Sequence, residues 1–180
     1  DAVSTTWSGG TTTEFYLFPR DGSYKERRFD LRISSATVDL EASDFTLLPD
    51  YQRIITPLEG GFTLTYKETG EKVTLAPLEE DFFDGAYHTH SIGKAIDFNV
   101  MYKKGMHAAY SVINASKKFG LADFRFLYVP FIDAKDLTGS TLNEHSLTRD
   151  TLYVSDDRSD AFVLALKKPV SLIYVSVRKA

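Results

Sequence analysis

The chain has 180 residues, of which 43% are hydrophobic and 26% are charged, and this length suits one domain or two small ones. It contains no cysteine, which excludes disulfides, thiolate metal sites and a cysteine nucleophile. The net charge is -4 without a basic block, so no nucleic-acid partner is expected, and no apolar run is long enough to span a membrane. No signal peptide is recognised, and the sequence favours a cytoplasmic location.

β-Forming residues dominate the chain. Thirteen Phe and ten Tyr against only two Met, with turn residues at short intervals, are typical of an all-β sandwich or barrel. The expected strands are 11–18, 29–40, 53–58 (interrupted by Pro57), 62–66, 72–76, 96–102, 107–114, 124–132 and 151–155, followed by a closing hairpin of 161–166 and 170–177.

The connections between these strands predict how the chain is divided. Residues 68–71 are expected to form a hairpin loop, and residues 133–149 a long polar connection. The charge pattern changes after Tyr102, and both halves show short strands with a late hairpin. We therefore expect two similar units, 1–102 and 103–180.

Polar residues alternate along two of the expected strands. Side chains two residues apart share a face, so Arg32 lies with Ser34, and Asp97 lies with Asn99. These faces could be solvated, with the opposite apolar faces toward the core, or they could line an interior. In an interior Asp97 needs a partner, because a lone buried charge is costly, and Arg32 or Arg53 would supply one. The result would be an anion pocket or a structural ion pair.

His88 and His90 are the closest-spaced histidines. On a strand they would point the same way and could bind one metal ion. The carboxylate ligand expected soon after them is absent, since the next acid is Asp97. The alternative is two surface histidines, and neither a metal nor another cofactor is predicted.

The N-terminal segment begins with Trp7, Ser8 and a glycine pair. Gly9 and Gly10 would let the backbone approach a ligand closely, and Glu14 would add a hydrogen-bond acceptor. The alternative is a lid anchored by the Trp7 indole, with Glu14 in solvent.

Several short motifs occur in an order that resembles the HutD/Ves family of bicupin proteins. They are Trp7 to Glu14 (WSGGTTTE) with Pro19, Arg32 to Val38 (RISSATV), Phe45 with Pro49 and Arg53, Leu58 to Gly60 (LEG), Phe83 to Gly85 (FDG), and Asp97 to Met101 (DFNVM). The second half matches only in its β character.

The resemblance implies a fold and a set of pocket residues. The fold would be a compact bicupin of two cupin barrels (double-stranded β-helices), 1–102 and 103–180, with strand exchange between them allowed and a pocket in the first. The residues that match family motifs, and so are expected to line the pocket, are Thr11, Glu14, Arg32, Ser34, Arg53, Asp97 and Asn99.

Three functions compete at this stage. The preferred one is a non-catalytic module that binds a small carboxylate metabolite such as urocanate or a formylated amino acid and moderates histidine utilisation, as the resemblance implies. The second is a metal-dependent cupin oxygenase or isomerase that uses His88 and His90. The third is a structural or interaction protein whose polar faces are solvated. No catalytic residue is assigned, and the oligomeric state is left open.

Overall fold

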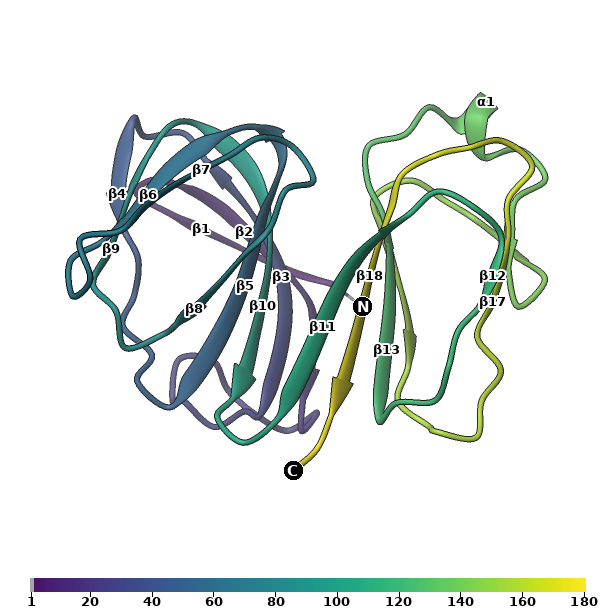
Figure 1. Ribbon diagram of the computed structural model, residues 1–180, viewed down its shortest axis with the longest axis horizontal. Helices are drawn as coiled ribbons and strands as arrows, with labels where there is room; N and C mark the ends of the chain where they lie inside the picture. Colours follow the sequence, from purple (N-terminus) through teal and green to yellow (C-terminus); the bar gives the residue numbers. More distant parts are fainter. Residues whose placement is uncertain (1) are drawn as a thin grey trace. The chain divides into compact units, whose positions relative to one another are not determined.

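The computed structural model describes residues 2–180, and the all-β prediction is confirmed (Figure 1). The chain forms two compact units, of which unit 1 runs to Lys104 and unit 2 from Gly105 to Ala180. Within the described residues the one α-helix is the short α1 (Ala134–Leu137). No helix in this part of the chain is long and apolar enough to cross a bilayer.

Unit 1 consists of two antiparallel sheets with an apolar core between them (Figure 1). The six-stranded sheet has the order β1 (Val3–Trp7), β2 (Gly10–Phe18), β3 (Leu31–Val38), β10 (Ala95–Lys103), β5 (Tyr51–Gly60) and β8 (Asp81–Asp84). The four-stranded sheet has the order β4 (Ala42–Asp44), β9 (Thr89–Ile92), β6 (Phe62–Tyr66) and β7 (Lys72–Leu75). Ile55 and Phe83 of the first sheet share this core with Phe62 and Leu64 of the second.

Strand β6 shows how the sequence specifies this arrangement. Phe62, Leu64 and Tyr66 are buried, whereas the two intervening threonines are partly exposed. Side chains alternate across a strand, so this pattern turns one face of the sheet toward the core. The predicted hairpin is also present, because residues 68–71 join β6 to β7, which are paired antiparallel.

The predicted interruption at Pro57 is wrong, since β5 continues to Gly60. The pairing between β5 and β10 shifts between Ile96 and Asp97, and Pro57 stands opposite Asp97 at this shift. Proline cannot donate a hydrogen bond to a neighbouring strand, and a bulge is one of the places where a sheet accepts it. The strand therefore bends at Pro57 without ending.

Unit 2 also contains two antiparallel sheets. One has the order β11 (His107–Ile113), β18 (Leu172–Arg178), β13 (Phe124–Val129) and β16 (Thr151–Ser155). The other has the order β12 (Lys117–Lys118), β17 (Val163–Ala165), β14 (Thr141–Leu142) and β15 (His145–Ser146). Leu127 and Leu172 of the first sheet pack with Leu164 of the second in one buried cluster.

The predicted closing hairpin is not formed. Strand β17 pairs with β12 and β14, whereas β18 pairs with β11 and β13, so the two strands belong to different sheets. Leu164 and Leu172 reach the same core from opposite sheets. The segment between these strands thus passes from one sheet to the other.

The expected polar connection at residues 133–149 contributes to the core instead. It carries α1, β14 and β15, and Leu137, Leu142 and Leu147 are all buried in the unit 2 cluster. These leucines are five residues apart, which matches neither the period of a strand nor that of a helix. Sequence periodicity therefore could not detect them.

Candidate functional site

The predicted polar residues of β3, β5 and β10 meet on the inner face of the six-stranded sheet. Asn99 stands opposite Ser34 on one side and Ile55 on the other, and Ile55 belongs to the unit 1 core. Because paired residues share a face, Asn99 and Ser34 point inward with Ile55. Arg32 and Arg53 stand opposite Met101, one inward-facing position further along β10.

Burial decides between the two interpretations of these polar faces. Only 5% of Asp97 and 6% of Arg32 is exposed, and Asn99 and Arg53 are equally buried. The solvated interpretation is therefore wrong, and these side chains line an interior. The opposite face of β10 is apolar and also buried, with Phe98 and Val100.

Within residues 2–180, Asp97 forms no ion pair with either predicted partner, Arg32 or Arg53, and Arg32 is engaged elsewhere. Its Nε donates to Glu14 Oε2 at 2.7 Å, its Nη1 donates to Ser34 Oγ at 3.1 Å, and its guanidinium lies 4.1 Å from the ring centre of Tyr24. Arg32 stands opposite Met101, which is four residues, or roughly 13 Å of strand, from Asp97. Glu14 lies on β2, the strand next to β3, and is closer to Arg32 than Asp97 is.

Arg53 is the least satisfied charge in this interior. Its Nε has no hydrogen-bond partner among residues 2–180, and its guanidinium lies over the rings of Phe45 and Phe83, 5.0 and 5.2 Å from their centres. Burial lowers the pKa of Arg53 to about 10, although Tyr24 and Asp97 act to raise it. The side chain is therefore a buried cation held by aromatic rings.

Asp97 and Asn99 complete the polar set. Asp97 Oδ1 accepts a hydrogen bond of 3.2 Å from the amide of Ala36, which stands opposite it on β3. Burial raises the pKa of Asp97 to about 7, while Arg53, this amide and Arg32 act to lower it. The Oδ1 atom of Asn99 is buried and has no partner within the described chain. The interior thus presents an unpaired donor on Arg53 and an unpaired acceptor on Asn99.

Aromatic residues that were not among the expected pocket residues pack against this set. Phe45 and Phe83 hold Arg53, and Tyr66 packs on Phe83 with ring centres 5.2 Å apart. The Tyr66 hydroxyl donates to Asp81, and burial together with this bond raises its pKa. Phe83 lies in the FDG motif, whereas no local pattern marks Tyr66 or Asp81 as a site residue. Asp81 reaches this region through the pairing of β5 with β8, which places it opposite Ile55.

Thr11 is the one expected pocket residue that the structure separates from the others. It stands opposite Thr37, whereas Glu14 stands opposite Ser34. Thr37 and Ser34 are three residues apart and so lie on different faces of β3. Thr11 therefore belongs to the face opposite Arg32, Ser34, Asp97 and Asn99.

The glycine pair approaches the protein's own backbone. A Cβ added at Gly10, where φ is +152°, would lie 1.7 Å from the carbonyl oxygen of Thr37. Gly10 thus allows the β1–β2 hairpin to pack closely on β3. Trp7 pairs with Gly10 and is 40% exposed, so the indole is not a buried anchor.

We expect Gly10→Ala to destabilise the protein by about 1 to 3 kcal/mol, because the methyl group would force the hairpin away from β3 and strain the backbone. Gly120→Ala is the matched control, since a Cβ there would meet no atom within 4 Å. Urea unfolding of both variants measures the difference. Equal stability of the two would contradict a packing role for Gly10.

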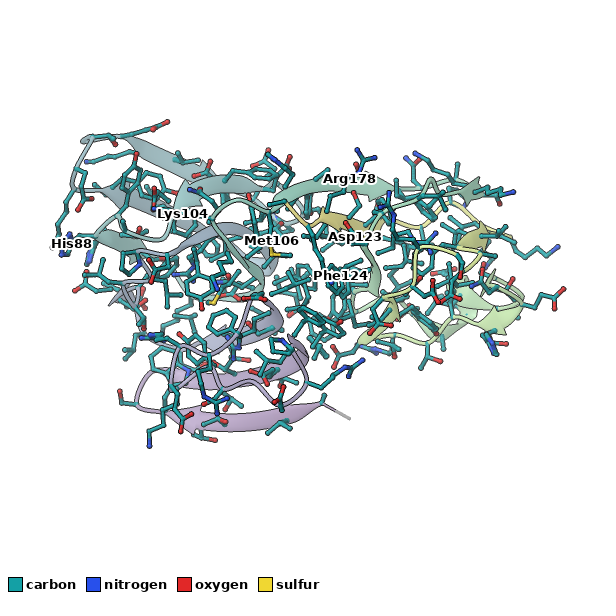
Figure 2. All side chains as sticks on the ribbon, turned by 90° about the horizontal axis from the view of Figure 1, so that it is seen from below. His88, Lys104, Met106, Asp123, Phe124 and Arg178 are labelled. Atoms are coloured by element: carbon teal, nitrogen blue, oxygen red, sulfur yellow. The ribbon has the colours of Figure 1, made fainter. Side chains whose placement is uncertain are left out.

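His88 and His90 do not converge on a shared site. His88 Nδ1 lies 2.5 Å from Glu68 and His90 Nδ1 lies 2.8 Å from Asp44, so each ring engages its own carboxylate. His88 lies at the outer edge of unit 1 with 58% of its side chain exposed (Figure 2). Among the residues that the structure describes, no three His, Cys, Asp or Glu side chains are grouped so as to hold a metal ion. The surface interpretation of the pair therefore fits the structure.

Comparison with known proteins identifies the family. A family model described as HutD matches residues 1–172. The chain belongs to the HutD family. The resemblance drawn from the motifs is thereby confirmed, and the match extends beyond those motifs into β18 of unit 2. No curated protein sequence matches this HutD-family chain.

Solved structures support the fold of this family member. HutD from Pseudomonas fluorescens SBW25 is 22% identical with a TM-score of 0.80, and the alignment covers 100% of this chain and 95% of that one. A conserved protein of unknown function from Pseudomonas aeruginosa PAO1 has the same identity and TM-score, with 99% and 95% covered. A cupin 2 conserved barrel domain protein from Leptotrichia buccalis is 9% identical with a TM-score of 0.58, covering 98% and 92%. The fold is thus of the cupin type.

Proposed function

We propose that this HutD-family protein is a non-catalytic bicupin whose unit 1 binds a small carboxylate metabolite. In this proposal each unit is one cupin barrel, and the ligand lies within unit 1 between Arg53 and Asn99. The observation that carries the proposal is the unpaired Nε of Arg53, buried beside Phe45 and Phe83.

An unpaired buried arginine is costly, and a bound anion would offset that cost. Guanidinium groups match carboxylates because their donors lie in the same plane and spacing as the two oxygens. Phe45 and Phe83 hold the guanidinium in place, which lowers the entropy lost when a ligand binds. These features favour a carboxylate over a neutral or cationic ligand.

The charge balance within the interior also supports an anionic ligand. Arg32 is neutralised by Glu14 at 2.7 Å, so the charge that remains is shared by Arg53 and Asp97. With a pKa of about 7, Asp97 is partly protonated near neutral pH, which leaves Arg53 incompletely compensated. Asn99 Oδ1 needs a hydrogen-bond donor, so we expect the ligand to carry an N–H or O–H group near its carboxylate.

The metabolic context is part of the same proposal. Membership of the HutD family supports a link to histidine utilisation, whose carboxylates, such as urocanate or a formylated amino acid, would combine an anion with an N–H group. The protein would then hold a pathway metabolite and moderate flux.

A comparison of matched charged and neutral ligands tests the proposal. We expect formate and urocanate to raise the melting temperature, because a ligand that binds only the folded state stabilises it. Formamide and the amide of urocanate have nearly the same shapes without the charge and should have little effect. Isothermal titration calorimetry at matched ionic strength then measures affinity. If charged and neutral ligands act alike, or none binds, unit 1 is not a carboxylate site.

A further inference from the structure

Unit 2 contains a recess that the proposed function of unit 1 does not use. Its volume is about 200 Å³, and it lies between the segment 117–122 and strand β18. Tyr174, Ser176 and Arg178 line it from β18, and Lys117 and Phe119 line it from the other side. Tyr174, Ser176 and Arg178 are at alternate positions, so they share one face of the strand.

The aromatic side of the recess is rigid. Phe119 stacks on Tyr174 with ring centres 4.1 Å apart and an angle of 18° between the rings. The ammonium group of Lys117 lies 5.7 Å from the centre of the Phe119 ring, which is an attractive cation–π distance. Lys117 thus places its positive charge at the recess, beside the aromatic pair.

The recess is lined by positive charge without a matching carboxylate. Within residues 2–180, neither Lys117 nor Arg178 forms an ion pair, and no acidic residue is among the lining side chains. The acid nearest in sequence is Asp123, which accepts a hydrogen bond of 2.8 Å from the Lys179 amide and lies 3.7 Å from Arg158. Lys117 and Arg178 are exposed, so a ligand from solvent can reach them.

A third cation, Arg125, lies on strand β13 beside the lining residues of β18. Arg125 is buried and stands opposite Ser176, and Leu127, two residues on, is in the unit 2 core, so Arg125 points to the same inner side. Its Nη2 donates to the Ser155 hydroxyl at 2.8 Å and to the carbonyl groups of Asp157 and Asp160.

The charge of Arg125 is not neutralised by these bonds. Its three acceptors are a hydroxyl and two carbonyl oxygens, and its Nε has no partner in the described chain. Asp157 is exposed, and the pKa of its carboxyl group is lowered mainly by hydrogen bonds from the amide and hydroxyl of Ser159, with Arg125 adding to the effect at a distance. The pKa of Tyr174 is raised by burial, while Arg125, Ser176 and Arg178 act to lower it.

We propose that this recess of unit 2, lined by Lys117, Tyr174, Ser176 and Arg178 with Arg125 beside Ser176 on β13, is a second site that binds a small oxyanion. Pockets for drug-sized ligands occupy roughly 300 to 1,000 Å³, so a recess of about 200 Å³ fits a smaller molecule. The two cations and two hydroxyl groups suit a carboxylate or a phosphate. The stacked Phe119–Tyr174 pair would contact an apolar or planar part of the ligand.

Titrations of the full chain with inorganic phosphate and with succinate, at constant ionic strength, test this site. We expect saturable NMR shifts at the amides of Gly120 and Ser176. Saturation by phosphate alone identifies a phosphate site, by succinate alone a carboxylate site, and by both a general oxyanion site. Absence of saturation with both probes would overturn the proposal.

Three variants separate local binding from general electrostatic attraction. Lys117→Gln and Arg178→Gln should each weaken binding about tenfold, the change expected for one charge-assisted hydrogen bond. Lys118→Gln is the matched control, because Lys118 has the same charge on the same strand and is not a lining residue. An equal loss in Lys118→Gln would refute a specific site.

A further variant, Arg53→Gln in unit 1, should leave these shifts unchanged. If it abolishes them, the signals report the unit 1 ligand, and the second site does not exist. The two proposals can therefore fail separately.

Discussion

Replacing Arg53 by glutamine is expected to weaken carboxylate binding about a hundredfold, because removing one partner of a buried charge pair costs roughly 2 to 5 kcal/mol. Arg53 is the buried donor that lacks a partner, whereas Arg32 already has Glu14 and Ser34. Calorimetric titration of formate or urocanate into both proteins measures the loss.

Folding should not obscure this result. The wild-type chain carries the cost of a buried, unpaired guanidinium, so an uncharged side chain should leave the free energy of unfolding unchanged or raise it. Arg28→Gln is the control, since Arg28 is an exposed arginine of the same unit that pairs with Glu26. Wild-type affinity in Arg53→Gln would show that the ligand does not contact this side chain.

The second large effect is expected for Asp97→Asn, which should stabilise the protein above neutral pH. The carboxyl group has a pKa of about 7 in the folded state against 3.8 without its surroundings. Between these values the folded protein keeps a proton that the unfolded chain has lost, so the stability of the wild type falls as pH rises from about 4 to about 7 and then levels off.

The asparagine variant has no such proton and should not show this fall. The difference between the two pKa values corresponds to at most about 4 kcal/mol, so we expect a gain of about 2 to 4 kcal/mol at pH 8 and little gain at pH 4. The asparagine Oδ1 can still accept the Ala36 amide. Urea unfolding at several pH values measures the profile, with the exposed Asp21→Asn as control. A gain independent of pH would show that Asp97 does not ionise in this range.

Local alternation predicted much of the candidate site. The two-residue spacing in β3 and β10 placed Arg32 with Ser34 and Asp97 with Asn99, and the structure keeps both pairs on one inner face. Alternation could not tell which face of β10 points inward, because Phe98 and Val100 on the other face are also buried. In a strand buried on both sides, the polar face is not the solvent face, so the contrast between polar and apolar residues does not identify the core.

The partners of the charged residues depended on register. The sequence indicated that a buried Asp97 would need a cationic partner and suggested Arg32 or Arg53, but in the structure Arg32 pairs with Glu14 of β2. The register of β2 with β3 shifts between Glu14 and Tyr16, and no local pattern in either strand predicts this shift. The unpaired state of Arg53 also depends on register, because the pairing of β5 with β10 places Met101, and not Asp97, opposite Arg53.

The sequence by itself determined the all-β class, the family and the set of residues that share each expected strand face, because these depend on composition, on short motifs and on the two-residue period of an extended chain. Only the tertiary structure decided which strands are neighbours, as in the separation of β17 from β18 into different sheets. It also decided which buried polar atoms lack a partner, on Arg53 and Asn99 in unit 1 and on Arg125 in unit 2. Strand pairing joins residues far apart in the chain, so it is set by the packing of the whole unit and not by any one segment.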